Sequence, residues 1–203
     1  MNARLLAACL AITIVSAARS APAPKSGGED ETPYKSAKVG DTATFKISTK
    51  VAGQNIDGTM TQTVTAKTDK EMTIKMATKM TVMGMDLPTP EQESKIDLTK
   101  PFDPLTGGLM GANGGGAAAK PMVEKLKEGK EKIKLAGKDY EAAWTTYKVN
   151  LPAGAGMNVD AEMKVWTSPK FAFHTLKMEM TADIAGMKME MTMELAEAGT
   201  KEK

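Results

Sequence analysis

The stretch KMEMTADIAGMKMEMTMEL, residues 177–195, decides the fold because its methionines alternate with polar residues on both sides of Ala185-Gly186. Alternation with a period of two residues is typical of a β-strand that has one apolar face. A turn at Ala185-Gly186 would make the stretch an antiparallel hairpin. The apolar pairs predicted by this register are Ile184–Met187, Ala182–Met189, Met180–Met191 and Met178–Met193. The polar pairs on the other face are Asp183–Lys188, Thr181–Glu190 and Glu179–Thr192.

The same period recurs along most of the chain, which has 203 residues and is long enough for one domain with a core. Threonine and lysine dominate the polar positions, and threonine is a β-branched residue that favours a pleated surface. Adjacent antiparallel hairpins are the natural arrangement of such segments. The expected strands lie near residues 42–51, 59–67, 72–82, 132–135, 140–149, 157–165, 175–184 and 187–196, and residues 91–98 are a candidate for a further strand. The total is about eight strands.

Three segments interrupt this pattern. Residues 83–90 break the alternation, and residues 101–119 form a Gly/Ala-rich stretch that we interpret as a surface loop. Residues 120–128 indicate one short helix. Pro121 suits a first helical turn, Met122 and Leu126 are spaced i and i+4, and Gly129 can end the helix.

The beginning of the chain has the pattern of a secretory signal peptide. A basic residue, Arg4, precedes an apolar run from residue 5 to residue 18, and small residues follow it. We therefore expect a signal peptide at 1–20, cut between Ala17 and Ala21, and an exported protein. A flexible tether at 21–38, one β domain at 39–197 and a disordered tail at 198–203 would follow.

Cys9 is the only cysteine, and Leu6-Ala7-Ala8-Cys9 is similar to the lipid-attachment box of bacterial lipoproteins. Only eight residues precede Cys9, and the apolar run continues past it, which argues against attachment of a lipid there. Cleavage after Ala17 would leave a mature chain without cysteine. That chain would have neither a disulfide nor a thiol nucleophile.

Charge composition argues against nucleic acid as a partner. Arg4 and Arg19 are the only arginines, so the chain beyond the signal peptide has 25 lysines and 25 acidic residues. It therefore lacks both a basic excess and the bidentate guanidinium group that suits phosphate and guanine. Beyond the N-terminal run, no segment of the sequence approaches the length of a membrane span.

The side chains that usually perform catalysis are sparse. His174 is the only histidine, and we interpret it as a partly buried or loop residue rather than as the base for nearby Ser168. One histidine without a mature cysteine cannot form a typical zinc site. Asp97, Asp103 and the glutamates near 91–93 do not have the spacing of a calcium loop. We therefore expect neither an enzyme nor a cofactor.

The 17 methionines are the remaining unusual feature. Soft thioethers suit Cu(I), but the alternation in 177–195 favours an apolar core face, since packing accounts for every methionine in the stretch. Methionine fills irregular space and is frequent on adaptable binding surfaces. A curved sheet lined with methionine would suit a deformable cavity for an apolar ligand. The candidate ligand-binding residues are Met76, Met80, Met163, Met178, Met180, Met191 and Met193.

Several short motifs resemble those of uncharacterised bacterial secreted β-proteins. They are Val39-Gly40-Asp41, Thr63-Val64-Thr65-Ala66-Lys67, Ile133-Lys134-Leu135-Ala136-Gly137-Lys138, Val165-Trp166-Thr167-Ser168-Pro169 and Leu176-Lys177-Met178-Glu179. The architecture is similar to that of the half-barrel lipoprotein carriers of the LolA and LppX kind. The resemblance covers about residues 39–195. It implies a mostly β fold, a curved antiparallel sheet partly plugged by helix, and no catalytic residues. A β-sandwich is the alternative fold.

The sequence thus predicts a non-enzymatic, exported or periplasmic protein that binds an apolar ligand, such as a lipid or a lipoprotein acyl chain, or another envelope component. A periplasmic Cu(I)-binding protein and a structural envelope domain without a ligand are the two alternatives.

Overall fold

The computed structural model of the chain describes residues 34, 36–82, 84–100, 122–152, 158–184 and 186–200. Ten β-strands form one antiparallel sheet, and the described residues contain no helix. The strands are β1 (Asp41–Val51), β2 (Gln54–Lys67), β3 (Glu71–Val82), β4 (Met85–Pro88), β5 (Gln92–Asp97), β6 (Met122–Leu135), β7 (Lys138–Pro152), β8 (Asn158–Thr167), β9 (Thr175–Ile184) and β10 (Met187–Thr200).

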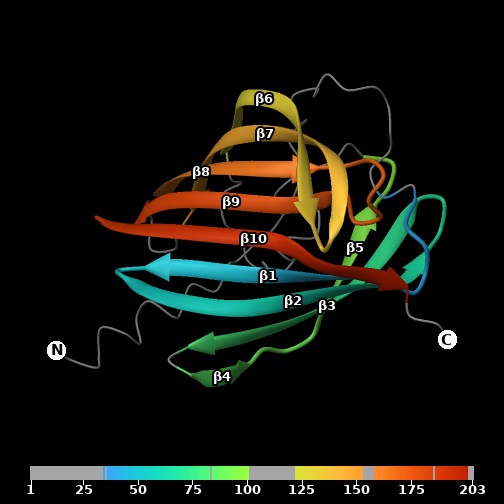
Figure 1. Cartoon of the computed structure of the whole chain (residues 1–203), viewed down its shortest axis with the longest axis horizontal. Helices are drawn as coiled ribbons and strands as arrows, with labels where there is room; N and C mark the ends of the chain where they lie inside the picture. The colour runs from blue at the N-terminus through green and yellow to red at the C-terminus, as the bar shows by residue number, and fades with distance from the viewer. Residues whose placement is uncertain are drawn as a thin grey trace.

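The sheet has the order β4-β3-β2-β1-β10-β9-β8-β7-β6 (Figure 1). Strands β6 to β10 form one run of hairpins and β1 to β3 another. The two runs join where β1 pairs with β10, with Phe45 opposite Leu195 and Ile47 opposite Met193. Figure 1 shows β6 and β7 bending strongly over the rest of the sheet. The all-β, open and curved sheet confirms the fold class expected from the sequence.

Strand β3 pairs with β2 along one edge, and two short strands share its other edge. β5 pairs with its first half, from Glu71 to Met76, and β4 pairs with its last four residues. β4 lies inside the segment 83–90, where we expected only a break in the pattern. Its four residues extend because β3 offers them an edge with free backbone donors and acceptors.

Residues 122–128 begin β6, so the helix expected there is wrong. The register of β6 against β7 shifts between Lys125 and Lys127, which makes Leu126 the extra residue of a β-bulge. Met122 and Leu126 are four positions apart in the sequence, a spacing that also occurs on one face of a helix. Both side chains are exposed, Met122 at 75% and Leu126 at 45%, so they do not form the buried face that a helix would need.

The packed region is longer at both ends than the interval 39–197 expected from the sequence. Tyr34 and Ala37, which we placed in the tether, are buried. The ammonium group of Lys67 donates hydrogen bonds to their carbonyl oxygens, at 3.0 Å from Tyr34 and 2.7 Å from Ala37. At the other end β10 continues to Thr200, whose hydroxyl donates to the carboxylate of Asp41 at 2.9 Å. The expected signal peptide and the Gly/Ala-rich loop lie outside the described residues.

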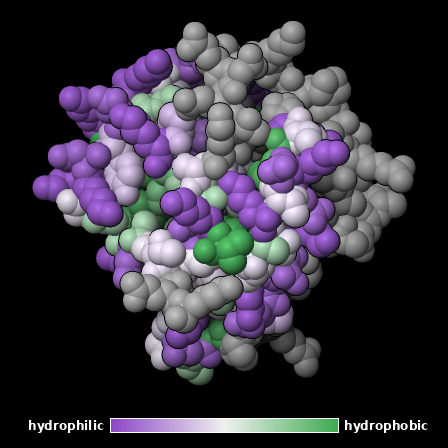
Figure 2. Space-filling view, turned by 90° about the vertical axis from the view of Figure 1, so that its right-hand side faces the viewer, coloured by the Kyte–Doolittle hydropathy of each residue, from purple (hydrophilic) through white to green (hydrophobic). Residues whose placement is uncertain are grey.

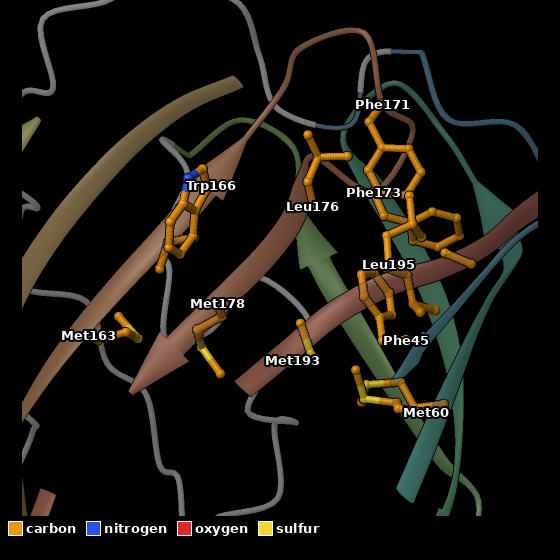
Figure 3. Packing of buried hydrophobic residues seen from close by; sticks show 14 of the residues in the cluster. Phe45, Met60, Met163, Trp166, Phe171, Phe173, Leu176, Met178, Met193 and Leu195 are labelled. Carbon is orange, nitrogen blue, oxygen red and sulfur yellow. The ribbon is translucent and has the colours of Figure 1, made fainter. Parts of the chain in front are cut away.

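The hydrophobic core lies against one face of this sheet. Its fully buried members include Phe45, Met72, Met163, Leu176 and Met178. Figure 3 shows several core residues on the strands β1, β2, β8, β9 and β10. Figure 2 shows the end of the molecule at which β10 finishes, where hydrophobic residues form small separate patches among hydrophilic ones.

Candidate functional site

The hairpin of β9 and β10 has the register predicted from the sequence. Met178 lies opposite Met193, Met180 opposite Met191, and Ala182 opposite Met189. Directly opposed residues of an antiparallel pair project from the same face of the sheet. The hairpin therefore gathers its methionines on one face, as expected.

Strand β8 extends this methionine face. Met163 lies opposite Met180 and Val165 lies opposite Met178. Three adjacent strands thus form two rows across the sheet. The first row is Met163–Met180–Met191 and the second is Val165–Met178–Met193. We call these six residues the methionine block.

The other two candidate residues lie on the same face but farther away. Met76 and Met80 belong to β3, which is separated from β10 by β1 and β2. Met80 faces Gly58, and Gly58 faces Ile47, which in turn faces Met193. The structure therefore brings five of the seven candidates into the methionine block and leaves two on a distant strand.

Exposure of the methionine face rises along the hairpin. Met178 and Met193 are 1% and 2% exposed, Met180 is 5% exposed, and Met191 is half-buried. Met187, next to the turn, is 37% exposed. Burying one methionine side chain contributes roughly 1.5–3 kcal/mol, so the second row is a strong part of the core. The apolar face thus runs without interruption from the closed core to the turn of the hairpin.

Aromatic side chains cover the opposite end of this face. Phe171 and Phe173 follow β8, and their ring centroids are 5.9 Å apart. Figure 3 shows both rings near Leu176, at the end where β9 begins. Tyr140 meets the Phe171 ring edge-on at 6.1 Å. Aromatic residues therefore cover one end of the methionine face, whereas exposure rises toward the other end, at the hairpin turn.

His174 belongs to this aromatic end, which agrees with its interpretation as a partly buried loop residue. Its ring centroid is 6.3 Å from that of Tyr34, and burial lowers the pKa of its imidazole to about 4. A low pKa keeps the imidazole neutral at pH 7. The backbone N–H of Ser168 donates to the carbonyl oxygen of His174 at 2.8 Å, a contact that shapes the turn.

A cleft of about 970 Å³ opens over the strands β10, β1, β2, β3 and β4. Its charged lining residues are Lys46, Asp57, Lys79, Asp86, Glu91 and Glu194. Hydroxyl groups hold two of these carboxylates, since Ser48 donates to Asp57 and Thr81 donates to Asp86, both at 2.8 Å. None of the candidate methionines lines this cleft. The sequence did not predict this cleft because its lining residues come mostly from five strands, and none of them stands out from the ordinary residues around it.

A second feature that sequence reasoning missed is an aromatic cluster on the face opposite Val165. Trp144 on β7 lies directly opposite Trp166 on β8. The indole N–H of Trp166 donates to the carboxylate of Glu131 on β6. Gly129, opposite Trp144, leaves room for the indole. The sequence has one sign of this cluster: Trp166 directly follows the apolar Val165 and so breaks the alternation of the strand.

Among the described residues, no group of three or more histidine, cysteine, aspartate or glutamate side chains is placed to hold a metal ion. Nor does this part of the chain contain a helix that is long and apolar enough to cross a membrane.

No protein-family model and no curated protein matches the chain. Solved structures do show a likeness. One is a protein predicted to be exported, with a YmcC-like fold, from Bacteroides fragilis; the match has a TM-score of 0.48 and 9% identity and covers 81% of this chain and 97% of that one. Another is a predicted lipoprotein from Parabacteroides distasonis, with a TM-score of 0.48, 9% identity, and coverage of 83% and 98%. A likeness at this level assigns neither a family nor a function to this chain.

Proposed function

We propose that the chain is a non-enzymatic exported protein that binds an apolar ligand, such as a lipid or a lipoprotein acyl chain, at the hairpin end of its methionine face. One observation carries the proposal. The apolar pairs Met180–Met191, Ala182–Met189 and Ile184–Met187 continue the buried core face to the turn, where exposure rises.

The chemistry of these side chains supports this ligand class. Methionine is unbranched and polarizable, so it can change rotamer to fit an acyl chain of variable shape. Val51, opposite Met189 on β10, is half-buried and extends the apolar surface onto β1. A ligand at this end would remove the exposed apolar area from water and be stabilised by the hydrophobic effect.

Export is supported by the N-terminal sequence pattern, in which Arg4 precedes an apolar run and small residues. The absence of catalysis is supported by the position of His174, the only histidine, which lies near the ring of Tyr34 at the other end of the face. The resemblance of this chain to the half-barrel lipoprotein carriers also supports an acyl chain as the ligand.

The test is to extract protein purified from its native host and to search the extract for lipid by mass spectrometry, then to titrate delipidated protein with a fluorescent fatty acid. We expect saturable uptake by the parent protein. Met189→Lys should weaken uptake at least about tenfold, because the apolar site would gain a charge. Met122→Lys, a change at an exposed position of β6, is the matched control and should bind as the parent does.

If the parent protein carries no lipid and takes up no fatty acid, the proposal fails and a structural envelope domain becomes the better interpretation. Equal uptake by the parent and the Met189→Lys variant, with the fold intact by circular dichroism, would place any binding elsewhere, and the cleft over β10, β1, β2, β3 and β4 would be the first alternative.

A further inference from the structure

The turns at one end of the sheet carry apolar residues that reach the surface. The turns that join β1 to β2, β3 to β4 and β9 to β10 all lie at this end, on the left in Figure 1. The apolar residues beside them are Val51, Val82, Met85, Ile184 and Met187. Met85 is 65% exposed and Met187 is 37% exposed, and the other three are half-buried. We call these five residues the apolar lip.

The apolar lip lies on the same face of the sheet as the methionine block. Val51 is directly opposite Met189. Val82 is two positions from Met80 along β3, and side chains two positions apart project from one face. Cross-strand pairs add the remaining members, Ile184 with Met187 and Val82 with Met85. The lip is therefore the rim of the apolar face.

The three turns extend from the sheet in regular steps. One row of directly paired residues crosses five strands and serves as the reference: Thr192, Ser48, Asp57, Thr81 and Asp86. Beyond this row β3 continues by one residue to Val82, β1 by three residues to Val51, and β10 by five residues to Met187. Each turn is two strands from the next and extends two residues farther.

These steps bring the turns to one level. With a rise of about 3.3 Å per residue and a strand spacing of about 4.8 Å, neighbouring turns are about 12 Å apart, on a line inclined by about 35° to the perpendicular of the strands. Strands in a barrel-like sheet tilt by about the same angle from the barrel axis. The three turns therefore end at nearly the same height along the axis of the curved sheet.

The charges beside the lip cancel. Four charged residues are direct sequence neighbours of lip residues, and all four are exposed: Lys50, Asp86, Asp183 and Lys188. The carboxylate of Asp183 accepts a hydrogen bond from the backbone N–H of Gly186 at 2.8 Å, which holds the β9–β10 turn in shape. The long side chains of Lys50 and Lys188 can keep their ammonium groups in water while the lip is covered. The lip thus has an apolar rim without a net charge.

The opposite end of the sheet is built differently. Exposed charged residues stand in or directly beside its turns, namely Asp69, Lys70, Lys138 and Lys170. Its large aromatic residues Phe171 and Phe173 are buried, and Val39 is the single large hydrophobic residue described there that is exposed. An apolar rim is therefore a property of one end only.

The form of the lip selects its partner. Exposed apolar side chains at a common surface mark sites of interaction with proteins or membranes. A protein partner would need a separate pocket for each of the three spaced turns, whereas lipids rearrange around every side chain that enters them. Apolar points at one level, without net charge, match the interface of a bilayer.

We propose that the apolar lip docks the protein on the surface of a lipid bilayer, with the side chains of Met85 and Met187 inserted among the lipids. Docking would bring the exposed end of the methionine face against the membrane. It requires no ligand on that face, and it stands or falls independently of the function proposed above.

The test is flotation of the full chain, as its native host exports it, with vesicles of phosphatidylcholine alone and of phosphatidylcholine with phosphatidylglycerol. We expect binding to both, and less than about a twofold change with anionic lipid or with salt, because the charges beside the lip cancel. The double variant Met85→Gln/Met187→Gln should bind at least about tenfold more weakly, since it removes both inserted apolar side chains.

Met122→Gln is the matched control and should bind as the parent does. Met122 is 75% exposed, but it projects from the opposite face of the sheet, because the adjacent Val123 pairs with the buried Val149. All three substituted methionines are exposed, so each variant should fold as the parent does. No flotation of the parent, equal flotation of the parent and the double variant, or flotation that requires phosphatidylglycerol and is abolished by salt would each overturn the proposal.

A second measurement does not depend on the variants. In protein labelled with ¹³C at the methionine methyl groups, a nitroxide-labelled lipid in the vesicles should broaden the signals of Met85 and Met187 and leave that of Met122 sharp. Equal broadening of all three signals would contradict docking through the lip. Fatty-acid uptake without vesicle binding would reject the docking alone, and vesicle binding without uptake would reject the apolar ligand alone.

Discussion

The ammonium group of Lys164 lies 4.2 Å from the ring centroid of Trp166 and 4.5 Å from that of Trp144. It is also 3.7 Å from the carboxylate of Glu131. One cation thus joins β6, β7 and β8 on the face of the sheet opposite Val165. A cation above an aromatic ring is attracted by the negative potential of the ring face, more strongly where water is excluded.

Replacing this cation should loosen the three strands. We expect Lys164→Met to lower the free energy of unfolding by about 1 kcal/mol, because it removes two cation–π contacts and an ion pair. Urea unfolding followed by far-UV circular dichroism measures the loss. The emission of the two tryptophans, Trp144 and Trp166, should change as well. Lys170→Met, whose exposed ammonium is 3.9 Å from Glu141, is the control and should change stability by less than about 0.5 kcal/mol. Equal losses in both variants would contradict a stabilising role for Lys164.

Gly129 should be required for the close approach of Trp144. A Cβ at this position would lie 2.6 Å from Cζ2 of the indole, so Gly129→Ala must displace the ring or the strand. We expect a loss of about 1–3 kcal/mol in the free energy of unfolding, the usual cost of overpacking. The matched control is Gly199→Ala in β10, where the nearest atom would be 3.9 Å away. Thermal unfolding that shows the same melting temperature for both variants would contradict this interpretation.

His174 should make the protein less stable in acid. Burial lowers its pKa from 6.5 to about 4 in the folded chain, so the unfolded chain binds this proton first as the pH falls. The stability that comes from keeping the imidazole neutral is complete above pH 6.5, decreases between pH 6.5 and about 4, and is lost below that range. The loss is roughly 3 kcal/mol.

The variant His174→Asn tests this linkage, since asparagine tolerates the positive φ of 64° at this position. Urea unfolding at pH 7 and at pH 4.5 gives the loss of stability on acidification for the parent and the variant. The parent should lose more, and the difference belongs to His174 because the chain has no other histidine. Parallel losses in the two proteins would show that carboxylates alone account for the acid sensitivity.

The sequence predicted each residue pair of the β9–β10 hairpin because the two features that define these pairs, the alternation of the strands and the position of the turn, are local in the sequence. Alternation defines the faces, and the short turn at Gly186 defines the register; Gly186 has a φ of 82°, which suits glycine. The pairing of β1 with β10 is different. It joins residues such as Ile47 and Met193, and no local signal specifies which distant strand completes a sheet.

The failed helix shows how a bulge misleads periodicity. Leu126 is the extra residue between Lys125 and Lys127, so the phase of β6 changes by one residue in the middle of the strand. Strict alternation is lost there, and a helical spacing appears by coincidence. The clustering of Met163 with Met180 and Met191 was also only partly predictable, since it required the order of β8, β9 and β10 as well as their faces.

The free edge of strand β6 affects whether the sheets of two molecules can join. It ends the strand order, so one of its edges has backbone groups that no described strand of the sheet pairs with. Five lysines follow along it, namely Lys125, Lys127, Lys130, Lys132 and Lys134, and the bulge interrupts its ladder. A strand from a second molecule would have to accept both the charge and the irregular spacing. The edge therefore opposes the intermolecular strand addition through which open sheets aggregate.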